Sequence, residues 1–322
     1  MVTVEVVLLS GAMASSSAIT LDVLTVANNG ARAEGRRPVF ETRLWGGGAS
    51  QFAPFVTTPA CADAPPDVLI IPGQGFTKVD DIPARLEERD VAAAADHLRD
   101  ANANGARIAS SCTGTLLLAK SGLLDGHRAT TSWWLAPLFA RLFPDVDLDT
   151  RAIVRTDGPF TTAGAAMAQM DLMVGLVARH AGARIANWCI RTMLLDERRS
   201  QTPYMGVTML AARDDRMSDV AAWARDRLEE GLGVADLADR ASMSARTFAR
   251  HVRRATGLSP IAFLQRIRVE RAVELLETTR LPFETIAAMV GYAEPSTLRA
   301  VIRRELGARP SEVRARAAPL AA

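Results

Sequence analysis

The sequence contains few of the residues on which disulfide frameworks and metal sites depend. It has 3 cysteines and 4 histidines among 322 residues. Cys61, Cys112 and Cys189 are odd in number and far apart, which argues against a disulfide framework and against a clustered metal site. This usage of cysteine fits a reducing compartment. We therefore expect a cytoplasmic protein that holds no metal and no cofactor.

Long apolar runs are also missing. No stretch reaches the roughly 18 apolar residues that are needed to span a bilayer. The first 18 residues contain an apolar run, but they lack the lysine or arginine of a secretory signal, and Glu5 lies within the run. This segment is predicted to be a buried first strand, and a membrane protein is not expected.

Charge is distributed unevenly along the chain. Apolar residues make up 48% of the sequence, and its length exceeds one average domain, so two packed domains are expected. Residues 240–316 contain 15 arginines against 7 glutamates, a net charge of +8. Such an excess indicates a polyanionic partner, although a solvated charged face is the simpler alternative.

Short β-rich segments alternate with helical patterns over residues 1–195. The predicted strands are "VTVEVVLLS", "FETRLWGG", "DVLIIPGQG" and "ARIASSC", with helices such as "ITLDVLTVANNGA" and "RLEERDVAAAADHLRDANANG" between them. Continuous apolar strands joined by crossover helices predict a doubly wound α/β domain with a parallel sheet. Ligands bind beyond the carboxyl ends of such strands, where "PGQG" and "CTG" fall.

Four segments carry a resemblance to a known family, namely "DVLIIPGQG", "IASSCTGTLLLAKSGLLDG", "ATTSWW" and "TTAGAAMAQMDLMVGLVARHAG". They resemble the class I glutamine-amidotransferase-like fold of the PfpI type, over nearly all of residues 1–195. The resemblance implies a flavodoxin-like fold with Cys112 at the position of the catalytic cysteine. In the family's enzymes this cysteine works with a histidine that follows a Thr-Thr pair, and often with a carboxylate after the first strand.

The sequence departs from the enzymes' pattern at both partner positions. Ser132 follows Thr130 and Thr131, and no acid follows the first strand before Asp22. His127 is predicted at the start of the strand "RATTSW", roughly 15 Å from Ser132 at ~3.3 Å per residue.

The other two histidines of this half are also predicted to have no catalytic role. His97 and His180 are predicted to be structural or solvated, with His180 as a cation at a helix C-terminus. A thiol without a base is mostly protonated at neutral pH, although the dipole of the helix "TLLLAKSG" favours the thiolate.

Three interpretations of Cys112 stay open at this point: core packing, pocket lining, and covalent or redox chemistry. The segments "PGQG", "SCTG" and "TTSWW" each follow a predicted strand, so they are expected to meet at the carboxyl edge of the sheet. The predicted effector pocket consists of Gln74, Cys112, Thr113, Ser132 and Trp133.

The C-terminal third contains a helix-turn-helix pattern twice. The first copy lies in "VADLADRASMSARTFARHVRRATGLSP". The pattern recurs with similar residues. The counterparts of Leu237, Ala238, Ala241, Ser242 and Met243 lie 49 positions later, as Ile286, Ala287, Val290, Gly291 and Tyr292. The counterparts of Phe248, Val252, Arg253, Arg254, Gly257 and Pro260 lie 50 positions later, as Leu298, Ile302, Arg303, Arg304, Gly307 and Pro310. The second turn is therefore predicted to be one residue longer. A helix pair without a DNA role is the alternative for one copy, and the repeat favours DNA binding.

This repeat, joined by the helix "PIAFLQRIRVERAVELLETT", resembles the AraC/XylS-type DNA-binding domain over about residues 218–316. The resemblance implies two units that enter successive major grooves on one face of the duplex. The residues predicted to contact DNA are Arg246 and Arg250 for bases, Arg253 and Arg254 for phosphates, and Ser296, Thr297, Arg299 and Arg303 in the second unit.

Two positions near these residues qualify the prediction. Ala300 stands at the position that matches Arg250, so the second unit is expected to read fewer bases. His251 lies beside the arginines and is expected to contact phosphate or solvent rather than to act as a switch.

The two resemblances together match the organisation of GlxA-type transcriptional regulators. The predicted domains are a sensor domain at 1–195, a linker at 196–217, a DNA-binding domain at 218–317 and a tail at 318–322. We expect a regulator that is not an enzyme, with promoter DNA, an unknown small-molecule effector and a second copy of the chain as partners. The alternatives are an active cysteine amidohydrolase or hydratase fused to a DNA-binding domain, and a redox sensor that uses Cys112.

Overall fold

The computed structural model describes residues 1–56, 64–76, 78–195, 201, 206, 211 and 214–316. The chain divides into two compact units, Met1–Gln201 and Thr202–Ala322. Cys61, much of the predicted linker and the predicted tail lie outside the described residues.

A six-stranded sheet forms the centre of the first unit, with the strand order β2-β1-β3-β4-β8-β7. Its strands are β1 (Val2–Val7), β2 (Phe40–Trp45), β3 (Val68–Ile71), β4 (Arg107–Ser111), β7 (Val154–Asp157) and β8 (Phe160–Ala163). Neighbouring strands pair in parallel from β2 to β8, and β7 pairs antiparallel with β8 at the edge. The predicted doubly wound α/β fold is confirmed.

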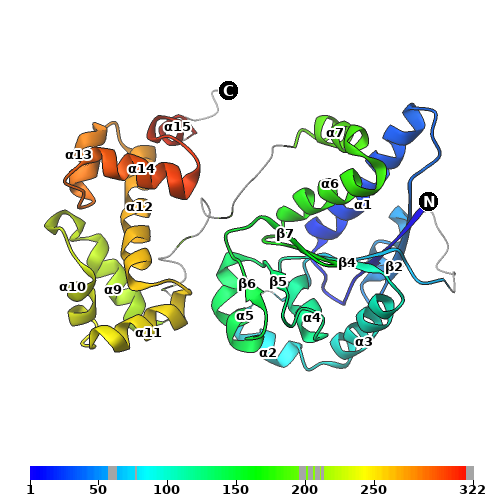
Figure 1. Cartoon of the computed structure of the whole chain (residues 1–322), viewed down its shortest axis with the longest axis horizontal. Helices are drawn as coiled ribbons and strands as arrows, with labels where there is room; N and C mark the ends of the chain where they lie inside the picture. Colours follow the sequence, from blue (N-terminus) through cyan, green and yellow to red (C-terminus); the bar gives the residue numbers. More distant parts are fainter. Residues whose placement is uncertain are drawn as a thin grey trace. The chain divides into compact units, whose positions relative to one another are not determined.

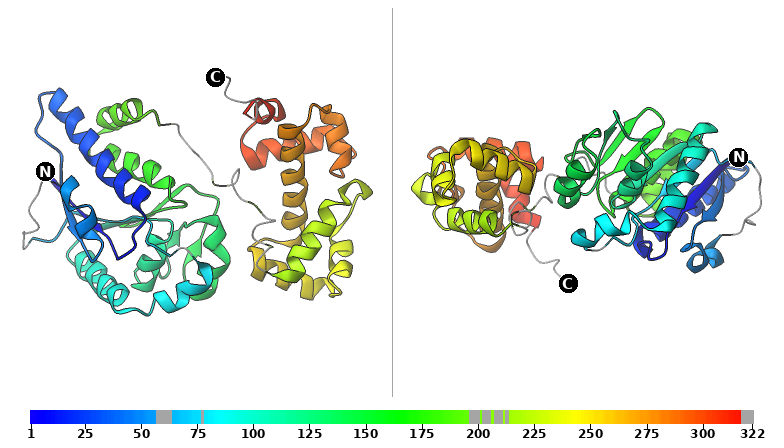
Figure 2. Two further views of the ribbon diagram at one scale, coloured as in Figure 1. Left: turned by 180° about the vertical axis from the view of Figure 1, so that it is seen from behind. Right: turned by 90° about the horizontal axis from the view of Figure 1, so that it is seen from below.

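Helices cover both faces of this sheet (Figures 1 and 2). One face carries α1 (Ala14–Ala33), α6 (Ala168–Ala181) and α7 (Ala183–Thr192), and the other carries α3 (Arg89–Ala103), α4 (Gly114–Lys120) and α5 (Ala136–Leu142), with the short α2 (Ile82–Arg85) nearby. In β3, Val68 and Ile70 pack into the first core, while Leu69 and Ile71 pack into the second. Burial on both faces explains the continuous apolar strands in the sequence.

The predicted strand "RATTSW" is much shorter than expected. Only Arg128–Ala129 form a strand, β5, which pairs with β6 (Asp147–Leu148) in a separate two-stranded sheet. The Thr130 amide then donates to the Thr162 hydroxyl at 2.8 Å. A side chain therefore accepts the hydrogen bond that a neighbouring backbone carbonyl would accept in a longer strand. Trp133–Leu135 form a 3-10 turn, so the two tryptophans do not continue a strand.

The second unit is entirely helical among its described residues. Its helices are α9 (Asp215–Arg225), α10 (Val234–Arg240), α11 (Ala245–Thr256), α12 (Pro260–Thr278), α13 (Phe283–Met289), α14 (Pro295–Leu306) and α15 (Pro310–Arg316), with a 3-10 turn at Leu228–Glu230. The long α12 connects the α10–α11 pair to the α13–α14 pair (Figure 1). Phe248 and Phe263 are fully buried in its single core.

One boundary in this unit differs from the expectation, because α9 begins within the segment that the sequence predicts as a linker. In the part of the chain that the structure describes, no helix is both long enough and apolar enough to cross a membrane.

Candidate functional site

Cys112 occupies a sharp turn between β4 and α4. Its φ of 52° lies in the left-handed region, which is uncommon for a residue other than glycine. Its amide donates to the Ala163 carbonyl oxygen at 3.0 Å, which fixes the turn against β8. A Cβ atom on Gly114 would lie 2.4 Å from the Ile71 carbonyl oxygen, so only glycine allows α4 to start this close to β3. The chain therefore builds the strand-to-helix elbow that exposes a nucleophile in many enzymes.

The sulfur at this elbow is enclosed, however. Cys112 is 3% exposed, and the Ser132 hydroxyl donates to its Sγ atom at 3.0 Å. Burial raises the pKa of the Cys112 thiol, against smaller opposing effects of the hydrogen bonds from Ser132 and Thr113. The sequence suggests that the helix dipole favours the thiolate, and burial acts in the opposite direction and sets the net shift. Among the described residues, no histidine or carboxylate hydrogen-bonds this thiol.

The histidines of the first unit lie away from the elbow or serve other contacts. His127 is 3.4 Å from Asp157, measured from Nδ1 to Oδ2, and lies at the opposite end of the sheet, as expected from its place in the sequence. His97 is 2.5 Å from Glu5 and stacks on an indole ring. Burial, followed by two nearby arginines, lowers the pKa of His180, which disfavours the helix-terminal cation that the sequence suggests.

The remaining predicted pocket residues lie next to Cys112, but two of them direct their polar groups to the backbone. The Gln74 carboxamide accepts from the Leu9 amide at 2.9 Å and donates to the Pro72 carbonyl oxygen at 2.8 Å. The Thr113 hydroxyl donates to the Gln74 carbonyl oxygen at 2.6 Å. The polar groups of Gln74 and Thr113 are therefore bonded within the protein. Trp133 is next in sequence to Ser132, which contacts the sulfur of Cys112.

Gln201 is a member of this region that sequence reasoning missed. It is 2% exposed, and its Nε2 atom donates to the carbonyl oxygens of Thr131, Thr150 and Ala152 at 3.0 Å each. Its Oε1 atom accepts from the Trp133 amide at 3.3 Å. The carboxamide thus occupies a cradle of backbone groups in the loops that follow β5 and β6.

No local pattern could have revealed this residue, because it belongs to the predicted linker and its partners lie 49 to 70 positions away. Gly164 provides the space, since a Cβ atom there would lie 2.1 Å from Nε2 of Gln201.

The same turn geometry occurs in both helix-turn-helix motifs of the second unit. The Met243 amide donates to the Ala238 carbonyl oxygen at 3.0 Å, and the equivalent bond joins Tyr292 to Ala287 at 2.9 Å. Between them, Ser242 has a φ of 54°, and its counterpart Gly291 has a φ of 77°. The predicted repeat is confirmed at the level of individual hydrogen bonds.

The difference between the two turns is confirmed as well. α10 and α13 are offset by 49 positions, whereas α11 and α14 are offset by 50. Ser244 caps α11 by accepting from the Thr247 amide at 3.3 Å, whereas Glu294 makes no such bond and α14 starts with Pro295. After the longer turn, α14 therefore starts with a proline at its first helical position, where α11 has a side-chain cap.

Arginines dominate the exposed face of α11. Phe248 is buried in the core, while Arg246, Arg250, Arg253 and Arg254 are all exposed. Within the described ranges, no carboxylate forms an ion pair with any of these four arginines, so the face presents uncompensated positive charge.

The exposed face of α14 carries less charge. Ser296, Thr297, Arg299 and Arg303 are all exposed, as is Ala300 at the position that matches Arg250. The Arg299 guanidinium lies 5.1 Å from the centre of the Phe283 ring, a stacking contact that the sequence did not indicate.

The expectation for His251 is wrong. Its Nε2 atom lies 2.7 Å from Asp214 Oδ2, so the ring is held by the residue that caps α9. The nearest guanidinium nitrogen of Arg254 is 3.4 Å away. His251 therefore fixes α11 to α9 rather than facing a phosphate.

Known proteins resemble this chain in sequence. The family model described as "Helix-turn-helix domain" matches residues 237–316. The chain is 28% identical to the HTH-type transcriptional regulator CdhR of Pseudomonas aeruginosa over 68% of this chain and 66% of that protein. It is 25% identical to the HTH-type transcriptional regulator GlxA of Rhizobium meliloti, over 70% of this chain and 71% of that protein.

A solved structure is similar to part of the chain as well. It is an AraC family transcriptional regulator from Pseudomonas putida, with 20% identity, a TM-score of 0.45, and coverage of 60% of this chain and 100% of that one. The chain covers slightly less than two thirds of CdhR, at 66% of its length. The repeated helix-turn-helix units thus fall within the residues that match the helix-turn-helix family model, and the chain is similar in sequence to HTH-type transcriptional regulators.

Proposed function

We propose that the protein is a transcriptional regulator that binds promoter DNA in a sequence-specific manner through α11 and α14. The observation that carries this proposal is the repeated helix-turn-helix geometry with exposed arginines opposite Phe248. In this proposal Arg246 and Arg250 contact base edges, while Arg253 and Arg254 mainly contact phosphates. Ser296, Thr297, Arg299 and Arg303 contact the second major groove.

A selection experiment tests the proposed DNA binding and does not require a known operator. The full chain is used to enrich duplexes from a random library, and the enriched sequence is then compared with its scrambled version at fixed salt. We expect at least a thousandfold preference, the lower end of the range for specific regulators. Equal affinity for the enriched and scrambled duplexes would refute sequence-specific recognition.

The proposed role of the first unit is to bind a small effector at the carboxyl edge of its sheet, with no chemical change to the ligand. Cys112, Ser132 and Trp133 form the centre of the proposed pocket, and Gln74 and Thr113 support it. A hydroxyl in place of the enzymes' histidine supports a binding role, as does the raised pKa of the thiol. The cradle that holds the Gln201 carboxamide favours an effector with N–H donors, which would compete with that side chain.

Two substitutions test this role. Ser132→Trp should fill the proposed pocket, so the response of DNA binding to effector is lost while basal DNA affinity stays within a few-fold. Cys112→Ser should keep both within a few-fold, because no thiolate step is required. Loss of a measurable amide or nitrile turnover in Cys112→Ser would instead support the enzyme alternative. Loss of a peroxide-dependent change in DNA affinity would support the redox sensor.

The proposal includes assembly into a homodimer, which places four helix-turn-helix units on one promoter. Light scattering of the full chain tests this part. A mass of about 69 kDa, twice the 34.6 kDa of one chain, supports it, and a monomer at micromolar concentration contradicts it.

A further inference from the structure

A second cavity of about 120 Å³ lies in the first unit, far from Cys112 along the strands. Val68, Arg107 and Pro159 line it at the starts of β3, β4 and β8, which is the amino edge of the sheet. Cys112 lies at the opposite, carboxyl edge, directly after β4. The cavity is therefore separate from the proposed effector pocket.

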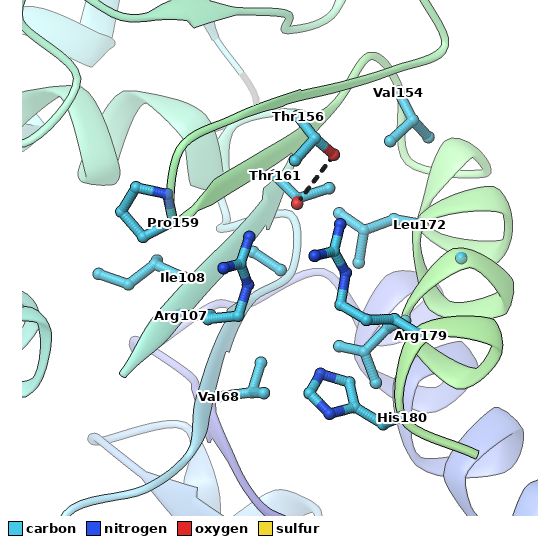
Figure 3. A pocket seen from close by; sticks show the side chains of 13 residues that line it. Val68, Arg107, Ile108, Val154, Thr156, Pro159, Thr161, Leu172, Arg179 and His180 are labelled. Atoms are coloured by element: carbon cyan, nitrogen blue, oxygen red, sulfur yellow. Dashed lines mark hydrogen bonds between the residues drawn. The ribbon is translucent and has the colours of Figure 1, made fainter. Parts of the chain in front are cut away.

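Positive groups gather at one side of this cavity. Figure 3 shows the guanidinium groups of Arg107 and Arg179 pointing into the same space, with the His180 ring below them. The two arginines are close enough that Arg179, after burial, lowers the pKa of Arg107. No aspartate or glutamate lines the cavity, and among the described residues no carboxylate forms an ion pair with either arginine. Arg107 donates to the Gly158 carbonyl oxygen at 2.8 Å, and Asp67 lies close enough to His180 to raise its pKa. Two guanidinium groups that face each other with no carboxylate bonded to either favour an anion between them.

The other side of the cavity is apolar. Val68, Leu172 and Leu176 line it, and the hydroxyls of Thr156 and Thr161 are bonded to each other at 3.1 Å. A fully hydrated anion such as phosphate would leave these aliphatic surfaces unused. An anion with a short hydrocarbon body matches both sides, because its head can face the arginines while its chain covers the aliphatic groups.

A glycine within α6 keeps this space open. Gly175 lines the cavity, and a Cβ atom built on it would meet no atom within 4 Å. Glycine in the interior of a helix costs about 1 kcal/mol relative to alanine, and neither a turn nor a close contact requires it here. The absence of a side chain at this point therefore serves the cavity rather than the fold.

We propose that this cavity is a binding site for a small monocarboxylate, with Arg107 and Arg179 holding the carboxylate and Val68, Leu172 and Leu176 contacting its hydrocarbon chain. The volume suits an acid of about six heavy atoms. This would be a second ligand site on the unit, independent of the elbow.

Butyrate, titrated into the full chain, is the probe, with butyramide and inorganic phosphate as matched ligands that lack the charge or the hydrocarbon chain. Binding is followed by the NMR signals of the histidine rings. The chain has 4 histidines, and the signal that is lost in His180→Gln belongs to His180. Burial, Arg179 and Arg107 lower the pKa of His180, while Asp67 raises it. Bound butyrate should therefore raise the pKa of His180 and leave the signals of His97 and His127 in place.

Two variants and one control complete the experiment. Arg179→Gln should weaken butyrate at least about tenfold, and Gly175→Leu should abolish binding by filling the cavity while keeping α6 helical. Arg141→Gln, an exposed arginine elsewhere on the unit, should change nothing. Circular dichroism of each variant confirms that it is folded.

Butyrate binding that is stronger than phosphate and butyramide binding, and lost in Gly175→Leu, supports the assignment. Equal responses to butyrate and butyramide, phosphate binding at least as tight as butyrate, unchanged binding in Gly175→Leu, or no binding of butyrate would each overturn it.

Discussion

The two units differ in the direction in which their polar side chains point. At the elbow of the first unit, the polar groups of Gln74, Thr113 and Ser132 are all buried and bonded to other protein atoms. On α11 of the second unit, Arg246 and Arg250 point into solvent and have no carboxylate partner within the described ranges. These three side chains of the elbow therefore form their hydrogen bonds within the protein, whereas the two arginines of α11 are free to bind a partner.

This contrast shows why an enzyme-like backbone does not by itself indicate an enzyme. The elbow is retained in its turn geometry and in the close approach of α4 to β3. A nucleophile also requires access and a base, and here burial holds the thiol protonated. The second unit has the repeated turn geometry and the exposed arginines on which the proposed DNA binding rests.

The arginines of α11 provide the largest expected effect. Arg250→Ala should cost about 1–3 kcal/mol on the enriched duplex and relax preference at one base pair, because a base contact is lost. Arg254→Ala should weaken all duplexes similarly and reduce the salt slope by about 1, because a phosphate contact is lost. Fluorescence anisotropy at several salt concentrations measures both. Equal losses on specific and scrambled DNA for the two variants would contradict this division of roles.

Substitution of Gln201 tests whether the buried hydrogen bonds of the first unit stabilise its fold. Gln201→Leu leaves the carbonyl oxygens of Thr131, Thr150 and Ala152 without their shared donor. We expect a loss of about 1–2 kcal/mol in the free energy of unfolding of this unit. Gln51→Leu, at an exposed position in the same unit, is the control and should change little. Equal urea midpoints for the two variants would show that the cradle does not stabilise the fold.

The second helix-turn-helix unit sharpens the comparison further. Ala300→Arg adds to the exposed face of α14 the positive charge that α11 carries at Arg250. DNA affinity should rise by up to about 1 kcal/mol, with a salt slope steeper by about 1 if the new side chain reaches a phosphate. Binding titrations at low and high salt measure this change. A weakened affinity would mean that α14 does not approach the groove as α11 does.

The thiol gives the smallest expected effect on DNA binding. Because the folded pKa of Cys112 is raised, the unfolded chain releases its proton first, and this group lowers the free energy of unfolding as pH increases past about 8.5. Alkylation of Cys112 by iodoacetamide at pH 8 should be far slower in the native protein than in urea. Peptide mapping measures both rates. Comparable rates in the two states would contradict a buried, protonated thiol.

Periodicity and repetition predicted much of this molecule, because those signals are local. The apolar strands through Val68 to Ile71 and the repeat that relates Ala238 to Ala287 are both confirmed. The short β5 was not predicted, because the hydroxyl of Thr162 replaces a backbone partner from a distant part of the chain. The pairing of Arg107 with Arg179 across β4 and α6 was missed for the same reason. Contacts between distant residues leave no periodic trace in one sequence.

The central claim is that two unequal helix-turn-helix units of one chain read one DNA site. A hydroxyl-radical footprint of the full chain on the enriched duplex tests it most directly. We predict two protected segments about 10–10.5 bp apart on one face of the duplex, with stricter base preference in the segment contacted by α11. Protection confined to a single groove, or a stricter preference in the segment contacted by α14, would contradict the account.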